Sequence, residues 1–429
     1  MLIMFRVKNF TSFKDDVVLD LRKTQYREHL NHTFQSGDFE LLKTVAIYGA
    51  NASGKSNLIS ALSYFERFIQ NQLFDEKKGF DSETDSDSEI RKTPSKPFLL
   101  AEPLAKEMEF EIIFSHNNNV YQYGYCIEET IICSEWLLIN NETVFEREKE
   151  NNNITFGKKY EKALKEYNRL REDRLYLAIL DYFVTDKKIK SKINDFKEYF
   201  QKKFNIYFEL IFESSVKGNP SIISYSKEFL KNENFRKKIS EYIRKIDVGI
   251  KDIVIDEEIK TDKRTGEQVR NLLPRTIHNI YDLNGEVIGE RAFDLKLESS
   301  GTLRFLSYIQ EILRMIEMGG IFIIDELSSR LHPLLTKFIV DIFQSEINVS
   351  NAQLIFTTHD VSLMNRDQFR RDEVVIIDKN QMGISTLQSL ADLGVRQDAS
   401  FSKDYFNGKY GGIPIFDYYI NPDNGDRNG

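Results

Sequence analysis

The sequence has little cysteine and no long apolar run. Its 429 residues include only 2 cysteines, Cys126 and Cys133, which are too few for a disulfide scaffold and leave no second pair for a metal site. No segment approaches the roughly eighteen apolar residues of a membrane-spanning helix, and the N-terminus lacks the apolar segment of a secretory signal. We therefore expect a soluble, cytoplasmic protein without a membrane partner, in which both cysteines are packing residues.

An excess of positive charge is also missing. Lysine and arginine total 59 against 67 aspartates and glutamates, a formal net charge of −8. This balance counts against nucleic-acid binding by the chain as a whole, although a local basic surface stays open. What the sequence does contain is 41% hydrophobic and 12% aromatic residues over a length greater than one average domain. That composition is ample for a packed core.

A phosphate-binding loop of the form G-x-x-x-x-G-K-[ST] begins at residue 49. The apolar run 42–48 before it predicts a strand, and the spacing of apolar residues over 57–72 predicts a helix. In this context backbone N–H groups and the helix N-terminus point at a polyphosphate. Lys55 is expected to reach the β- and γ-phosphates and Ser56 to bind Mg²⁺. The residues predicted to bind ATP here are Gly49, Ala50, Asn51, Ala52, Ser53, Gly54, Lys55, Ser56 and Asn57.

A second motif is the apolar run 320–324, which ends in Asp325 and Glu326. It predicts a buried Walker B strand. Asp325 is expected to hold Mg²⁺ through its water shell, and Glu326 to orient the water that attacks the γ-phosphate. His29 and His32 share a helical spacing but have no third ligand nearby in sequence. ATP and Mg²⁺ are thus the expected cofactors.

Two shorter motifs gain meaning from their order along the chain. Ser299, Ser300 and Gly301 precede an amphipathic helix predicted over 303–316, and His359 ends a strand predicted over 354–358. Taken alone, the first is a helix cap and the second an ordinary histidine. His332 and Pro333 then open a helix whose buried stripe is predicted to be Leu334, Leu335, Phe338, Ile339, Ile342 and Phe343.

Together these motifs resemble the ATP-binding-cassette ATPases of the SMC/RecF-like branch. Residues 9–13, 326–333 and 405–414 also look like the bacterial abortive-infection ATPases. The resemblance implies a head-to-tail dimer or a higher homo-oligomer, with ATP between the phosphate loop of one subunit and Ser299-Ser300-Gly301 of the other. It further implies catalytic roles for Lys55, Glu326 and His359, the last as a γ-phosphate sensor. The chain departs from the family pattern at Ser328, where aspartate is usual, and at Arg330, where a small residue is usual. No residue is assigned to the glutamine that such ATPases carry.

The expected fold class is α/β, an ABC-type P-loop domain with a mixed sheet and a flanking antiparallel meander, split by an inserted helical region. The predicted divisions are 1–159, a lobe with the phosphate loop and the meander; 160–246, the helical insertion; and 247–429, a lobe with the remaining motifs. Strands are predicted at 2–7, 17–21, 109–114, 120–127, 130–139, 250–259, 279–283 and 373–378, helices at 167–183 and 187–204, and an acidic loop at 75–96.

Three functions are compatible with these motifs. Only 70 residues follow His359, too few for a nuclease domain with its own acidic metal cluster. The favoured hypothesis is therefore an anti-phage sensor and scaffold that controls a separately encoded effector, either a nuclease or a toxin. The alternative is an SMC/RecF-like repair or recombination ATPase that clamps DNA, with a basic patch formed by Lys187, Lys188, Lys190, Lys192 and Lys197. A transporter ATPase subunit is a weaker third possibility.

Overall fold

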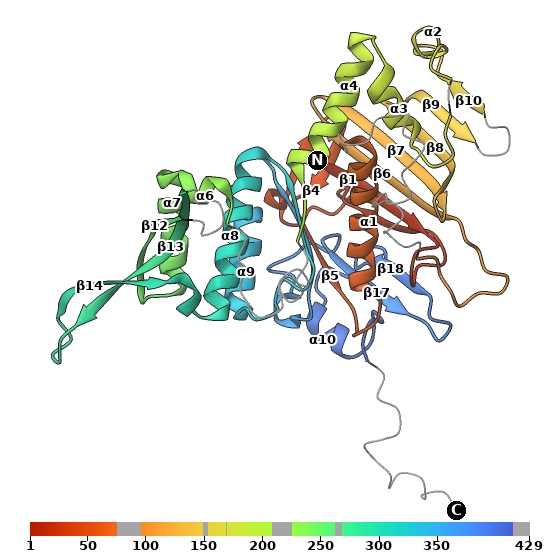
Figure 1. Cartoon of the computed structure of the whole chain (residues 1–429). Helices are drawn as coiled ribbons and strands as arrows, with labels where there is room; N and C mark the ends of the chain where they lie inside the picture. The colour runs from red at the N-terminus through yellow and green to blue at the C-terminus, as the bar shows by residue number, and fades with distance from the viewer. Residues whose placement is uncertain (75–95, 149–152, 169, 208–224, 262–267, 415–429) are drawn as a thin grey trace, which may run out of the picture.

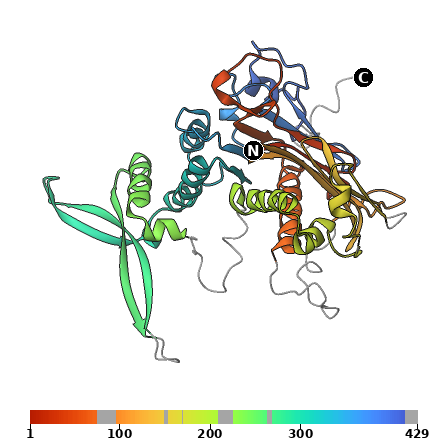
Figure 2. The ribbon, with the colours of Figure 1, turned by 90° about the horizontal axis from the view of Figure 1, so that it is seen from above.

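The computed structural model describes residues 1–74, 96–148, 153–168, 170–207, 225–261 and 268–414. The acidic loop expected at 75–96 lies outside the described residues except for Lys96. Two large sheets dominate the described part, and a smaller three-stranded sheet extends away from them (Figures 1 and 2).

The central sheet has six strands in the order β11-β15-β16-β5-β17-β18. The first five pair in parallel and β18 pairs antiparallel with β17, so the sheet is mixed, as predicted. Because the C-terminal ends of parallel strands meet at one edge, the loops that follow β5, β15 and β16 lie together. The strands are β11 (Phe204–Tyr207), β15 (Ile321–Ile324), β16 (Gln353–Thr357), β5 (Thr44–Tyr48), β17 (Val374–Lys379) and β18 (Ser385–Ser389).

Helices cover both faces of this sheet, which explains why its inner strands are apolar throughout rather than alternating. Successive residues of β5 point to opposite faces: Val45 and Ile47 belong to one buried cluster, and Ala46 and Tyr48 to the other. The first cluster contains α1 (Lys55–Leu73), and the second contains α8 (Ser300–Met318) and α9 (Pro333–Gln344). No helix of the described residues is both long and apolar enough to cross a membrane.

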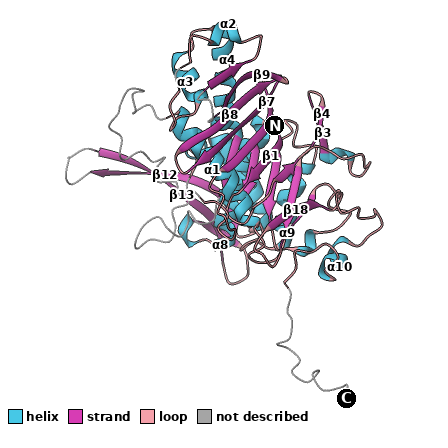
Figure 3. Ribbon diagram, turned by 90° about the vertical axis from the view of Figure 1, so that its right-hand side faces the viewer, coloured by secondary structure: helices cyan, strands magenta, loops and turns pink. Residues whose placement is uncertain are grey.

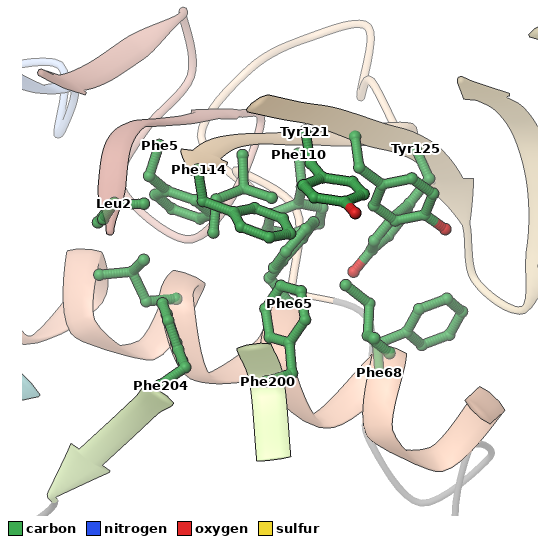
Figure 4. Close-up of a cluster of buried hydrophobic side chains, with 14 of the residues drawn as sticks. Leu2, Phe5, Phe65, Phe68, Phe110, Phe114, Tyr121, Tyr125, Phe200 and Phe204 are labelled. Atoms are coloured by element: carbon green, nitrogen blue, oxygen red, sulfur yellow. The ribbon is translucent and has the colours of Figure 1, made fainter. Parts of the chain in front are cut away.

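An antiparallel sheet of seven strands packs on the other side of α1 (Figures 1 and 3). Its contacts with α1 are largely aromatic: the Phe65 ring lies 5.4 Å from Tyr125 and 5.8 Å from Phe5, and Phe68 lies 5.0 Å from Tyr125 (Figure 4). The predicted meander is therefore confirmed. The sheet order is β10 (Asn153–Phe156), β9 (Glu142–Glu148), β8 (Ile131–Ile139), β7 (Asn119–Glu128), β6 (Met108–His116), β1 (Leu2–Lys8) and β2 (Val17–Asp20).

The helices predicted at 167–183 and 187–204 are shorter than expected. Within residues 167–183 the long helix is only α3 (Tyr176–Phe183). It begins at Tyr176 because the carboxylate of Glu135 in β8 accepts hydrogen bonds from the backbone N–H groups of Tyr176 and Leu177, 2.5 and 3.0 Å long. The second contains α4 (Lys187–Glu198) and the π-helix η3 (Tyr199–Lys203). Phe204 instead begins β11, which pairs with β15. The segment 160–246 is thus not purely helical, because it supplies an edge strand of the central sheet.

The three-stranded sheet consists of β12 (Ile250–Thr261), β13 (Gln268–Tyr281) and β14 (Val287–Asp294). The strand predicted at 279–283 is only the end of β13, and Leu283 lies fully exposed beyond it. The sheet is tied to the core by α7 (Glu233–Ile246), whose buried face joins the cluster of α8.

The remaining elements are short. They are η1 (Leu30–His32), β3 (Thr33–Ser36), β4 (Phe39–Leu42), α2 (Glu161–Leu164), α6 (Lys227–Lys231), η4 (Leu295–Leu297), η5 (Val361–Leu363) and α10 (Phe401–Phe406). One side-chain prediction on α9 is wrong, since Leu334 is 68% exposed while Ile339 on the same helix is fully buried.

Candidate nucleotide-binding site

The phosphate loop connects β5 to α1 and depends on its glycines. A Cβ atom on Gly49 would lie 2.4 Å from the carbonyl oxygen of Ile377, and one on Gly54 would lie 2.7 Å from the hydroxyl of Ser385. Gly54 also has φ +120°, which strains any other residue. The loop is therefore wrapped tightly enough for its backbone N–H groups to approach a phosphate.

Lys55 is buried at the start of α1. Its ammonium group donates hydrogen bonds to the carbonyl oxygens of Gly49 and Ala50, each 2.9 Å long. Burial lowers its pKa to about 8, and the carboxylates of Asp325 and Glu326 act in the opposite direction. The negative charges of both Walker B acids thus act on the ammonium group of Lys55.

Asp325 and Glu326 follow β15 directly and share one partner on the neighbouring strand. The hydroxyl of Thr357 donates to Asp325 Oδ1 at 2.6 Å and accepts from the backbone N–H of Glu326 at 2.7 Å. Glu326 has φ +54°, so the chain turns sharply between the two acids. Thr357 was not among the expected site residues. The available signal was its place at the end of the strand beside the acids.

His359 lies two residues beyond β16, with its side chain exposed. Partial burial lowers the pKa of His359, the positive charge of Lys55 lowers it further, and Asp325 opposes both. The imidazole is therefore more readily neutral than an ordinary histidine. These interactions place His359 in the same electrostatic neighbourhood as Lys55 and Asp325.

Ser299 and Ser300 are exposed at the N-terminus of α8. The Ser299 hydroxyl caps the helix by accepting from the backbone N–H of Thr302 at 3.1 Å, and the Thr302 hydroxyl donates to Asp247. Gly301 lies against the loop after Glu326, because a Cβ there would be 3.4 Å from the carbonyl oxygen of Arg330. The structure thus groups Lys55, Asp325, Glu326 and His359, whereas Gly301 contacts the loop that follows Glu326 and Ser299 and Ser300 stay exposed.

The two positions that depart from the ABC pattern also make defined contacts. Ser328 is hydrogen-bonded to Thr358, with 2.9 Å between the two hydroxyl oxygens. Arg330 has φ +59°, a left-handed conformation that costs energy for any residue other than glycine. Both therefore shape the loop that leads from Glu326 to α9.

Comparison with known proteins identifies the family. Residues 45–365 match a family model described as "AAA domain, putative AbiEii toxin, Type IV TA system". The chain belongs to this AAA-domain family. It is therefore an ATPase of the AAA kind, and the match includes the phosphate loop, the Walker B acids and His359. No protein with a curated description matches this AAA-domain ATPase.

Solved structures similar to this AAA-domain ATPase include three SMC head domains. That of Thermotoga maritima is 14% identical, with a TM-score of 0.42, and the match covers 90% of this chain and 98% of that one. The Pyrococcus furiosus head, bound to the C-terminal domain of ScpA, is 15% identical, with a TM-score of 0.39. That match covers 95% of this chain and 98% of that one. That of Pyrococcus yayanosii is 12% identical, with a TM-score of 0.42, and the match covers 91% of this chain and 98% of that one. Likeness at this level is too weak to carry a functional assignment.

The donor atoms of Ser56 and Asp325 are of the type that Mg²⁺ prefers, since both are hard oxygens. Ser56 is exposed in the first turn of α1, and Asp325 is partly buried directly after β15. Among the described residues, one group of acidic and cysteine side chains has ligand atoms close enough for a metal ion: the carboxylates of Glu107 and Glu128 and the thiol of Cys133 lie within 4.8 Å of one another. Burial raises the pKa of the neighbouring Cys126 thiol, so Cys126 itself remains protonated at neutral pH.

The lowered pKa of Lys55 predicts that ATP binding is coupled to proton uptake. A triphosphate beside Lys55 should raise its pKa from about 8 back toward the usual lysine value. Binding at about pH 9 should therefore take up as much as about one proton, measured by titration calorimetry in buffers of different ionisation enthalpy. Lys55→Arg is the matched control because arginine stays protonated throughout. Equal uptake by this variant would contradict the assignment to Lys55.

Proposed function

We propose that the protein hydrolyses ATP at a Mg²⁺-dependent composite site formed by two copies arranged head to tail. The observation that carries this proposal is the exposure of the 299–301 segment: the charges of Asp325 and Glu326 act on Lys55, and Lys55 acts on His359, while Ser299 and Ser300 are exposed at the start of α8. One copy would supply the phosphate loop. The other would supply the 299–301 segment.

The exposed start of α8 is chemically suited to that role. The helix has 19 residues, and the first N–H groups of a helix have no partner within it. Ser299 satisfies the N–H of Thr302, which leaves the N–H groups at Ser300 and Gly301 directed toward the helix N-terminus. Together with the positive end of the helix dipole, these donors would stabilise a γ-phosphate held by the other copy.

The remaining groups divide the chemistry between them. Glu326 would orient the attacking water and accept its proton, and a neutral His359 would donate a hydrogen bond to the γ-phosphate. Ser56 and Asp325 would hold Mg²⁺, which offsets the phosphate charge when it is bound. Thr357 would keep both Walker B acids in register through its two hydrogen bonds.

We further propose that this ATPase acts as the sensor and scaffold of an anti-phage defence system and controls a separately encoded nuclease or toxin. The family description, which names a toxin-antitoxin context, supports this hypothesis. The DNA-clamp alternative loses part of its expected contact surface, because Lys190 and Lys197 are both paired with Asp181, at 2.8 and 2.6 Å. Lys192 donates to Asn119.

The composite site predicts complementation between two inactive variants. Lys55→Ala lacks the phosphate ligand, and Ser300→Arg blocks the exposed helix start. When the two variants are mixed, about half of the dimers contain one copy of each. Each mixed dimer has one complete site out of two, with an intact loop from one copy and an intact 299–301 segment from the other. About a quarter of wild-type activity should therefore return in single-turnover hydrolysis. The control mixes Lys55→Ala with the double variant, in which no complete site can form. No recovery above this control would refute the composite site.

The regulatory role predicts a protein partner that depends on nucleotide. Glu326→Gln should retain ATP while hydrolysis falls by about two orders of magnitude or more, which traps the bound state. Tagged Glu326→Gln, recovered from its native host with ATP and Mg²⁺, should retain one smaller protein in a fixed ratio. Lys55→Ala, which cannot load ATP, should not retain it. Recovery of DNA without a protein partner would favour the clamp instead.

A further inference from the structure

Two segments from opposite ends of the chain meet at the phosphate loop. They are residues 9–13, between β1 and β2, and residues 405–414, at the end of the described chain. Neither lies within residues 45–365, which match the family model. The functions discussed above assign no role to either segment.

The C-terminal segment folds into a compact turn that is closed by its own contacts. The Tyr405 hydroxyl donates to the carbonyl oxygen of Gly412 at 2.7 Å, and Lys409 pairs with Asp404 at 2.6 Å. Gly411 and Gly412 have φ of +71° and +65°, values that residues with a side chain rarely adopt. The turn therefore presents bare backbone on one side.

That backbone lies directly against the first glycine of the phosphate loop. A Cβ atom on Gly412 would lie 3.3 Å from Cα of Gly49 and 2.8 Å from a methyl group of Ile376. On the same side, the Tyr405 ring packs edge-on against Tyr48, which precedes Gly49, with the ring centres 6.3 Å apart. The turn thus supports the loop where it leaves β5.

The N-terminal segment supports the other end of the loop. The Ser12 hydroxyl accepts a hydrogen bond from Asn57 Nδ2 at 2.7 Å and lies 2.8 Å from the hydroxyl of Ser385. Ser385 in turn donates to the carbonyl oxygen of Ser53 at 2.5 Å. Glycine at position 54 fits beside this pair because it has no Cβ. A Cβ there would lie 2.7 Å from the hydroxyl oxygen of Ser385 and 3.0 Å from that of Ser12.

We propose that Ser12 and Gly412 are positioning residues for nucleotide binding, which fix the two ends of the phosphate loop. The inference rests on the proposal above that the loop holds ATP. Its physical basis is preorganisation: donors that are already held in the bound geometry do not lose conformational freedom when the triphosphate binds. The two chain ends thereby become part of the nucleotide site without touching the ligand.

The test compares two glycines that have the same φ angle. Gly412 and Gly394 both have φ +65°, but a Cβ on Gly394 would meet nothing within 4 Å. Gly412→Ala and Gly394→Ala should therefore share the backbone strain, while only Gly412→Ala displaces the loop. We expect the Kd for ATP of Gly412→Ala to rise about tenfold or more, and that of Gly394→Ala to stay at the wild-type value. Thermal unfolding of both variants verifies that each is folded.

Two milder variants guard against misfolding. Tyr405→Phe removes the hydrogen bond to Gly412 but keeps the ring against Tyr48, and Ser12→Ala removes the acceptor of Asn57. Both should weaken ATP binding at little cost in unfolding temperature. Affinities equal to wild type in these two variants, together with equal affinities of Gly412→Ala and Gly394→Ala, would overturn the inference. If wild-type protein itself bound no ATP, the proposed function would fail instead.

Discussion

The burial of α1 between two sheets is the constraint on which the rest of the structure depends. Its Phe65 side chain contacts aromatic rings of the antiparallel sheet (Figure 4). The same buried cluster includes Val45 and Ile47 of the central sheet. Removing a buried phenylalanine of this kind typically costs about 3–5 kcal/mol, so the helix cannot shift without large losses in packing. Because α1 begins at Lys55, the phosphate loop inherits this rigidity.

Electrostatic interactions favour the binding of an anionic ligand at this rigid site. Lys55 is buried, and its lowered pKa shows that its charge is less stable there than in water. The nearby carboxylates of Asp325 and Glu326 offset part of that cost, and a bound triphosphate would offset more. The parallel pairing of β5, β16 and β15 brings these groups to one edge. Binding of the polyphosphate is thus favoured by charge as well as by backbone donors.

The parts of the fold that the sequence predicted are those with local signals. Alternating apolar and polar residues predicted the meander. The glycine pattern, with a strand before it and a helix after it, predicted the phosphate loop. The errors came from contacts distant in sequence. Phe204 leaves a helical pattern to pair with Ile321, and Glu135 sets the start of α3 from another strand. Leu334 has the spacing of a buried residue but is 68% exposed among the described residues. Thr357 was missed for the same reason, and the roles of the site residues stay predictions.

We propose that ATP is held between two copies of the chain. The most direct test is the mass of Glu326→Gln in solution, measured by light scattering at several concentrations with and without ATP and Mg²⁺. We expect ATP to double the mass, and we expect Ser300→Arg introduced into the same chain to abolish that change. A mass that is unchanged by ATP, or a dimer that persists with Ser300→Arg, would show that the two copies do not hold ATP between them in this way.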